Sequence, residues 1–252
     1  MMWDQLQAIF PGLEWSLVLV YVRLQACILI LPGLGERVIT GRVKVAMALA
    51  LTPLLSGLAP AIQIPLQPLG LVRQVGIEML LGLAAGTMLR LLALAIDIAT
   101  TAIAATASLS QIMGVQNEMS PHPIGNMLHL AGIAILMALG LPVMLVELMA
   151  DSLTLWPPAS LPAAEGLAMA VVRIVADSFW LAMLLAAPFT LGGFLYQSLS
   201  AVINRVMPAL PVVFIGAPAS ILLALAALAV LAPLLLGIWA DAVLGFMLPP
   251  IP

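Results

Sequence analysis

The chain has 252 residues, of which 64% are hydrophobic and 8% charged, and its formal net charge is −3. Soluble domains carry roughly a quarter charged residues, so this composition excludes an ordinary soluble protein. It predicts an all-α, polytopic integral membrane protein, because helices satisfy their own backbone groups where lipid offers no partner. The single cysteine, Cys27, excludes an internal disulfide and a cysteine-based metal cage.

The beginning of the chain differs from a secretory signal peptide. Asp4 and Glu14 precede the first positive charge, Arg23, and no small-residue cleavage site follows. We expect this segment to stay uncleaved. Beyond it, apolar stretches predict helices near residues 15–31, 43–59, 72–110, 125–150, 167–203 and 211–247. Turn-rich pieces separate them at residues 32–42, 60–68, 111–126 and 156–162.

The third and fifth stretches are longer than one membrane crossing. About 20 residues cross a bilayer as a helix, so each stretch is either a long tilted helix that extends beyond the membrane or a helical hairpin. Pro188, followed by Gly192 and Gly193, favours a bend in the fifth stretch.

Glu78 is an ionisable residue inside an apolar stretch, where it is costly unless paired or hydrated. It is either an anchor between helices or part of a proton path, or it lies near the membrane interface, where helix-start amides and the neighbouring Arg73 partly neutralise it. Gly82 and Gly86 follow at a spacing of four and form a small-residue face that permits close helix approach.

Arg90 and Asp97 form a second group of intramembrane charges. They are two helical turns apart, so their side chains can partly neutralise each other. Structural pairing is a better explanation of such a pair than charge transport, although a transporter that uses Glu78, Arg90 and Asp97 stays an alternative.

The segment from Ser110 to Pro123 mixes amides, methionines, glycine and proline, and it is predicted to be non-helical. Irregular backbone between apolar helices is tolerated outside the membrane or where it lines a protein cavity. The segment is therefore either a surface loop or a plug. Methionine is flexible and polarisable enough to seal an irregular gap and reopen it.

The last apolar stretch has an unusual beginning. Residues 206–240 carry no charge, yet Pro208, Pro211 and Pro218 interrupt this run within eleven residues. Each proline frees a backbone carbonyl that hydrocarbon cannot satisfy but packed neighbouring helices can. The pattern predicts a broken, membrane-inserted segment within a helical assembly around a path.

Several signatures of chemistry are missing from the sequence. It contains no phosphate-binding G-x-x-x-x-G-K-[ST], no H-E-x-x-H and no G-x-S-x-G. We therefore expect no catalytic residues, no cofactor and no enzyme activity. His122 and His129 are seven residues apart without a third ligand nearby, so we expect no metal site.

Three runs of residues share one pattern with a known family: residues 36–39 with 41–45, residues 77–86 and residues 204–218. They resemble the family of the flagellar biosynthetic protein FliR and its virulence-secretion homologue SctT. The resemblance extends over nearly the whole chain in the same order, and residues 204–218 are its most specific part.

This resemblance implies a non-enzymatic subunit of the flagellar type III protein export gate. With FliP and FliQ, and in contact with an FlhB-like subunit, such a protein forms the channel through which unfolded flagellar proteins cross the bacterial inner membrane at the flagellar basal body. Exported polypeptides and lipid are then its other partners, and no nucleic acid is expected. The implied fold is one membrane domain over residues 1–252, with a FliP-like part at about 1–165 and a FliQ-like hairpin at about 166–252.

The resemblance also assigns residues to roles. It implies a pore plug that includes Gln111, Met113, Gly114, Gln116, Met119 and Pro121. It implies subunit contacts through Asn204, Arg205, Pro208, Pro211, Phe214, Gly216 and Pro218.

The chain departs from the family pattern at three places. Ser120-Pro121 replaces Asp-Pro, Ala209 replaces an amide, and Gly140-Leu141-Pro142 replaces Gly-His. These departures put individual contacts in doubt and leave a virulence-type secretion gate as an alternative. A secondary transporter or ion channel is a further alternative. A membrane enzyme would need a polar cluster at one membrane face that two histidines do not provide.

Overall fold

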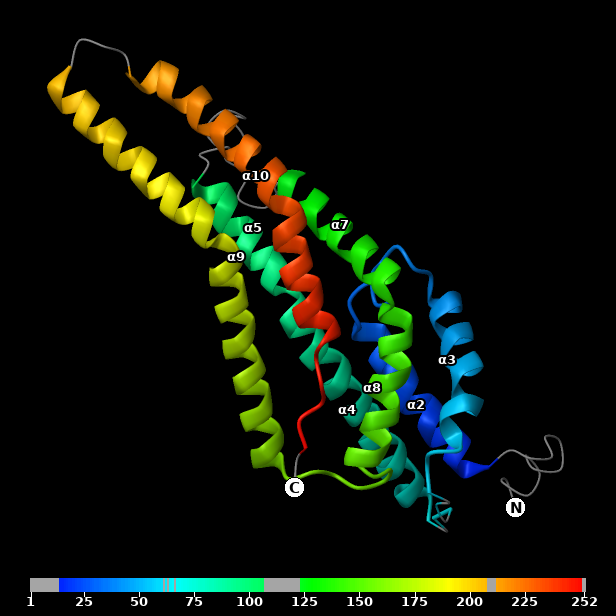
Figure 1. The fold of residues 1–252 in the computed structure, drawn as a ribbon. Helices are drawn as coiled ribbons and strands as arrows, with labels where there is room; N and C mark the ends of the chain where they lie inside the picture. Colours follow the sequence, from blue (N-terminus) through cyan, green and yellow to red (C-terminus); the bar gives the residue numbers. More distant parts are fainter. Residues whose placement is uncertain are drawn as a thin grey trace. The chain divides into compact units, whose positions relative to one another are not determined.

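The computed structural model describes residues 14–60, 62, 64–65, 67–106, 123–207 and 212–250. Every regular element in these ranges is a helix (Figure 1). The helices are α2 (Trp15–Ile30), α3 (Gly41–Ser56), α4 (Pro68–Ala93), α5 (Ala95–Thr106), α7 (Pro123–Leu139), α8 (Leu141–Leu155), α9 (Ala164–Val206) and α10 (Val212–Leu244).

Three helical segments among the described residues are long and apolar enough to cross a membrane. The candidate spans are Pro68–Ile103, Ala164–Val206 and Pro218–Leu244, and α7 with α8 forms a bent pair that adds a fourth if it is one span. The all-α, polytopic membrane architecture predicted from composition is therefore confirmed.

The long third and fifth stretches are not hairpins within the described residues. The third consists of α4 and α5, interrupted only at Leu94, and the fifth is the single helix α9 of 43 residues with Pro188 inside it. A proline can be accommodated in a membrane helix when neighbouring groups re-satisfy the freed carbonyl. The long-helix alternative is thus the correct one of the two.

The other boundaries differ from prediction in two places. The stretch 125–150 is divided at Gly140, whose φ of 110° lies in the left-handed region that glycine adopts readily. Pro142 follows in the first turn of α8, where its missing N–H costs little. The second difference is in α10, which begins at Val212 and continues through Pro218. The sequence predicted a break at that proline, and the helix has none there.

The chain divides into two compact units. Unit 1 comprises residues 1–91, 139–174 and 246–252, and unit 2 comprises residues 92–138 and 175–245. In unit 1, α3 contacts both α2 and α8, and the fully buried side chains include Leu19, Leu81 and Trp156. In unit 2, the core includes Ile96, Leu136, Leu185 and Trp239.

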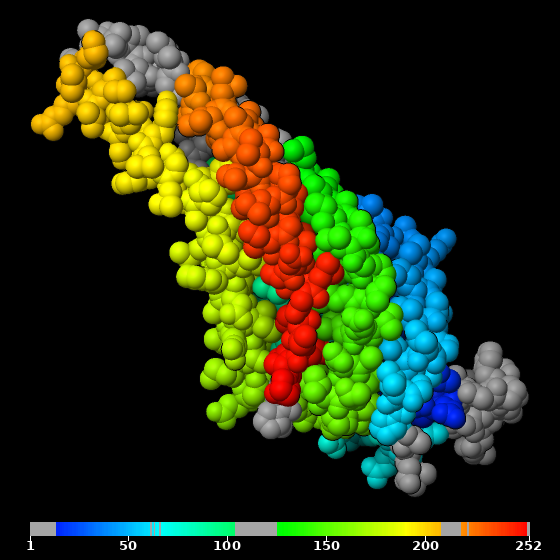
Figure 2. Space-filling view, viewed as in Figure 1, coloured from blue at the N-terminus to red at the C-terminus, as the bar shows by residue number. Residues whose placement is uncertain are grey.

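Much of the apolar surface of the last two helices is open in this single chain. Figure 2 shows one face of the molecule, on which α10 is visible along most of its length. Large apolar side chains are exposed along both helices, including Trp180, Phe194 and Val206 on α9 and Leu222 and Val230 on α10. Lipid or partner protein must cover such a surface.

Candidate functional site

An ion pair between α2 and α4 is buried inside unit 1. The Nε of Arg23 donates to Oε2 of Glu78 at 2.6 Å, and the two side chains are 1% and 0% exposed. Both residues lie in apolar helices, where an unpaired charge would be very costly. The pair therefore links α2 to α4 through opposite charges that neutralise each other.

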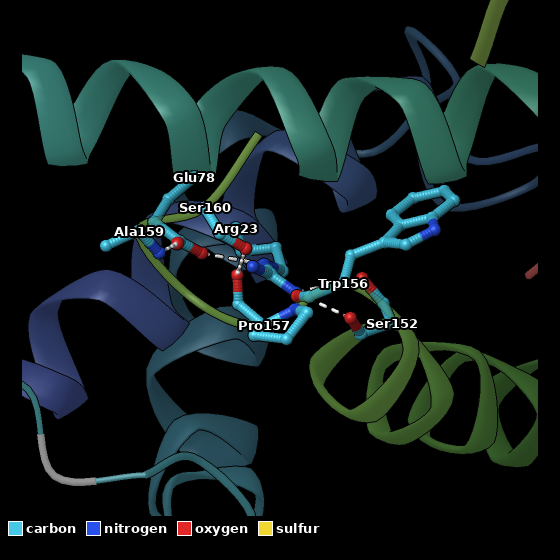
Figure 3. Close-up of polar contacts among 7 residues, drawn as sticks. All are labelled: Arg23, Glu78, Ser152, Trp156, Pro157, Ala159 and Ser160. Atoms are coloured by element: carbon cyan, nitrogen blue, oxygen red, sulfur yellow. Dashed lines mark hydrogen bonds and ion pairs between the residues drawn. The ribbon is translucent and has the colours of Figure 1, made fainter. Parts of the chain in front are cut away.

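The same two side chains also bind the end of α8 and the connection that follows it (Figure 3). The Nη1 of Arg23 donates to the carbonyl oxygens of Ser152 at 2.8 Å and Trp156 at 2.9 Å. The carbonyl of Ser152 also accepts the N–H of the C-cap residue Trp156 at 3.1 Å, and the carbonyl of Trp156 lies beyond the last residue of α8. Arg23 thus caps α8 while it pairs with Glu78.

The second oxygen of Glu78 holds the connection between α8 and α9. Oε1 accepts the backbone N–H of Ala159 at 2.7 Å. Ala159 has a φ of 62°, a left-handed conformation that is rare for a residue with a side chain. The hydrogen bond from Glu78 helps to hold this strained turn.

These contacts fit the interpretation of Glu78 as an anchor, because its side chain binds both α2 and the connection that follows α8. Arg73 is exposed, and Ala159, whose N–H donates to Glu78, lies before the start of α9. A role of Glu78 in a proton path stays a prediction. Sequence reasoning missed Arg23 as the partner. The available signal was a lone arginine in one apolar helix and a lone glutamate in another.

Gly82 and Gly86 lie where α4 meets α2. A Cβ at Gly86 would stand 2.8 Å from the carbonyl oxygen of Cys27, and a Cβ at Gly82 would overlap the carbonyl oxygen of Arg23. The missing side chains therefore permit direct backbone contact between the two helices. This close approach also brings Arg23 within reach of Glu78.

Arg90 and Asp97 do not pair with each other in the structure. Arg90 donates to the carbonyl oxygen of Ile30, the last residue of α2, at 3.0 Å and lies 3.6 Å from the carboxylate of Glu36. Asp97 instead pairs with His129 of α7, with 2.9 Å between Oδ1 and Nδ1. The predicted mutual neutralisation is wrong because each charge has a nearer partner on another element.

The predicted plug residues Gln111, Met113, Gly114, Gln116, Met119 and Pro121 lie outside the described residues, as do Pro208 and Pro211 of the predicted subunit contact. Asn204, Arg205 and Pro218 are exposed, and Phe214 and Gly216 belong to α10. Among the described residues, no group of three or more His, Cys, Asp or Glu side chains could hold a metal ion.

The fold and the buried charges define a class of protein: a polytopic helical membrane protein in which a buried ion pair, Arg23 with Glu78, joins two apolar helices. Residues 15–245 match the family described as bacterial export proteins, family 1. The chain belongs to this family.

The chain is similar in sequence to the flagellar biosynthetic protein FliR of Caulobacter vibrioides. It is 29% identical over 231 residues, which cover 88% of this chain and 90% of that protein. The resemblance found in the three sequence runs is therefore supported along nearly the full length of the chain.

Proposed function

We propose that this chain is a subunit of the flagellar type III protein export gate in the bacterial inner membrane. With FliP-like and FliQ-like subunits it forms the channel through which unfolded flagellar proteins leave the cytoplasm, and it contacts an FlhB-like subunit. The observation that carries the proposal is the family match over residues 15–245, together with the flagellar name of the relative that aligns over 88% of the chain.

The helix lengths support a role inside an assembly. At 1.5 Å per residue, the 43 residues of α9 extend over about 65 Å, whereas the hydrocarbon core of a bilayer is about 30 Å thick. Apolar side chains are exposed along the whole helix, from Met169 to Val206. Lipid cannot cover all of them, so partner subunits are the natural cover for the remainder.

In this proposal, residues 111–126 are the plug loop, and Gln111, Met113, Gly114, Gln116 and Met119 occlude the channel at rest. Residues 107–122 connect α5, which ends at Thr106, to α7, which begins at Pro123. The tail from Asn204 to Pro218 contacts neighbouring subunits, and the FliP-like and FliQ-like parts are residues 1–165 and 166–252.

The test is co-purification. The tagged chain is expressed with the membrane proteins encoded beside it, extracted in mild detergent, and analysed for bound subunits and their ratio. We expect a stable complex with FliP-like and FliQ-like subunits. An unrelated polytopic membrane protein with the same tag controls for nonspecific capture.

A monodisperse chain without partners would contradict the proposal, and solute uptake or current from that chain alone in liposomes would favour the transporter or channel alternative. Deleting the chromosomal copy separates the flagellar from the virulence-type gate. We expect loss of flagellum assembly; normal flagella with a lost secretion phenotype would favour the SctT-type alternative.

A further inference from the structure

The loop between α2 and α3 in unit 1 is held in place by two cations. Arg90 of α4 donates to the carbonyl oxygen of Ile30 at 3.0 Å, and its guanidinium lies 3.6 Å from the carboxylate of Glu36. From α3, Nζ of the buried Lys44 donates to the carbonyl oxygen of Gly35 at 2.8 Å. Arg90 and Lys44 are thus used to fix the loop to the helices around it.

The backbone of this loop, residues 31–40, is also closely packed. Leu31 and Leu34 are 0% and 4% exposed. A Cβ at Gly35 would stand 2.7 Å from the carbonyl oxygens of Leu29 and Leu31, closer than real Cβ atoms approach. The loop therefore presents its exposed side chains from a fixed backbone.

Two arginines at this end of unit 1 take no part in these contacts. Arg37, in the loop, and Arg42, at the start of α3, are both exposed. Within the part of the chain that the structure describes, neither side chain has a hydrogen bond or an ion pair. The carboxylate next to Arg37 in sequence, that of Glu36, already faces Arg90. The two guanidinium groups therefore form a cationic surface that lacks an anion.

The outer face of α3 continues this surface as an apolar one. One side of the helix is buried, and α3 contacts α2 and α8 (Figure 1). On the exposed side, Val43, Leu49 and Leu54 are 48%, 57% and 66% exposed, and no charged residue of α3 follows Lys44. Leu49 and Leu54 lie about 10 Å and about 18 Å along the helix from Arg42. One leaflet of a bilayer has a hydrocarbon depth of about 15 Å, so the apolar face is about as deep as one leaflet.

The chemistry of the two surfaces together fits an anionic phospholipid. Basic side chains at the end of an apolar helix attract anionic headgroups, and the planar guanidinium of arginine binds phosphate oxygens through paired hydrogen bonds. A free anion would account for the arginines but not for the apolar face. An acidic protein segment would likewise leave that face uncovered.

We propose that Arg37 and Arg42 bind the phosphate group of an anionic phospholipid whose acyl chain lies along the exposed face of α3. Arg90 and Lys44 are positioning residues in this site, because they fix the loop and do not touch the lipid. The inference goes beyond the proposed export function and does not depend on it.

The experiment uses the full chain in phosphatidylcholine vesicles that contain a photoactivatable phospholipid with its reactive group in the acyl chain. One probe has the anionic phosphatidylglycerol headgroup, and the other has the zwitterionic phosphatidylcholine headgroup. Mass spectrometry of the cross-linked chain locates the labelled residues. We expect the anionic probe to label α3 around Leu49 and Leu54 more strongly than the zwitterionic probe does.

Replacing the arginines should remove this preference. Arg37→Gln and Arg42→Gln should each lower the labelling of α3 by the anionic probe about fivefold, which corresponds to about 1 kcal/mol per basic residue near an anionic surface. Labelling by the zwitterionic probe should not change. Arg37→Lys with Arg42→Lys keeps both charges and should retain most of the preference. If the double glutamine variant does not reconstitute, the two single variants provide the same test.

The matched control is Arg73→Gln with Arg173→Gln. It removes two exposed arginines from α4 and α9 within unit 1, so its net charge equals that of the double variant at Arg37 and Arg42. It should leave the labelling of α3 unchanged. An equal loss in this control would mean that total charge attracts the lipid, and the site would be wrong. Equal labelling of α3 by the two probes would overturn it as well.

Two further measurements identify other occupants. If inorganic phosphate at constant ionic strength abolishes the preference, the arginines bind free phosphate and the lipid proposal is wrong. If α3 loses its label in the complex with FliP-like and FliQ-like subunits and cross-links to one of them instead, the surface is a protein interface and the proposal is also wrong. Preferential labelling of a chain that co-purifies with no partner would support the lipid site and contradict only the export gate.

Discussion

At the scale of single residues, Arg23 and Glu78 make several contacts, and removing either residue is expected to lower stability strongly. Removing one partner of a buried pair leaves the other charge uncompensated, which costs about 3 to 5 kcal/mol. Arg23→Ala and Glu78→Ala should therefore both lower the melting temperature of the purified complex and the amount of chain in the membrane. Arg23→Lys should rescue little, because one ammonium cannot reproduce the separate contacts of Nε and Nη1.

The control for this prediction is Arg73→Ala. Arg73 is on the same helix as Glu78 and close to it in sequence, but it is exposed. Its removal should change stability by less than about 0.5 kcal/mol, as is usual for surface positions. A tolerated Arg23→Ala together with a damaging Arg73→Ala would mean that Glu78 has a different partner from the one described.

Ala159 allows a second test of the same cluster. Its φ of 62° costs roughly 1 to 2 kcal/mol for a residue with a Cβ, and glycine avoids that cost. Ala159→Gly should therefore be neutral or stabilising in a thermal melt, despite the extra freedom of glycine in the unfolded chain. Ala168→Gly, at an exposed position inside α9, should instead lose about 1 kcal/mol. Equal losses at both positions would show that the turn is not strained.

At the scale of elements, the spacing between α2 and α4 depends on glycine. Gly82→Ala would force a methyl group onto the backbone of α2 at Arg23, so the helices must separate and the distance from Arg23 to Glu78 must grow. We expect a loss of stability similar to that of other overpacked sites, about 1 to 3 kcal/mol. Cysteine cross-linking between α2 and α4 would report the larger spacing.

Gly76→Ala is the matched change for this prediction. It lies on the same helix, but a Cβ there would meet nothing within 4 Å. Alanine should stabilise α4 at this position by roughly 0.5 to 1 kcal/mol, since glycine is the poorer helix former. If Gly82→Ala behaves in the same way, direct backbone contact between α2 and α4 is refuted.

The helices themselves could be predicted well from the sequence, because long apolar runs bounded by turn residues are a strong local signal. Their interruptions could not. Gly140 follows the end of α7 in a left-handed backbone conformation, which a single glycine in the sequence does not predict. Pro218 is accommodated inside α10. Partners between distant helices were harder still: Arg23 and Glu78 are 55 residues apart, and no local pattern connects them. Arg90 and Asp97 show the same limit, because two charges that are near in sequence contact different elements in space.

At the scale of the whole molecule, the length of α9 sets a limit on what lipid can cover. Its exposed apolar side chains extend from Met169, 67% exposed, to Val206, 72% exposed. A bilayer shields about 20 residues of a helix, so wherever the membrane lies, part of this apolar surface falls outside it. In the proposed gate, partner subunits cover that part. A measurement of side-chain accessibility along α9 can therefore locate both the part of the helix that lipid covers and the part that partner subunits cover.

Cysteine scanning separates these two contributions. Single cysteines at Val172, Met183, Phe194 and Val202, in a chain with Cys27→Ala, would be treated with a water-soluble maleimide in membranes. In the chain expressed alone, we expect lipid to protect cysteines within a segment of about 20 residues from the maleimide. Cysteines outside that segment should be labelled. Co-expression with the partner subunits should protect further positions, while a cysteine at Val38, which lies in a turn and is 86% exposed, is labelled under both conditions. An unchanged profile would remove α9 from the subunit interface, and the export proposal would then need another surface to join the chain to its partners.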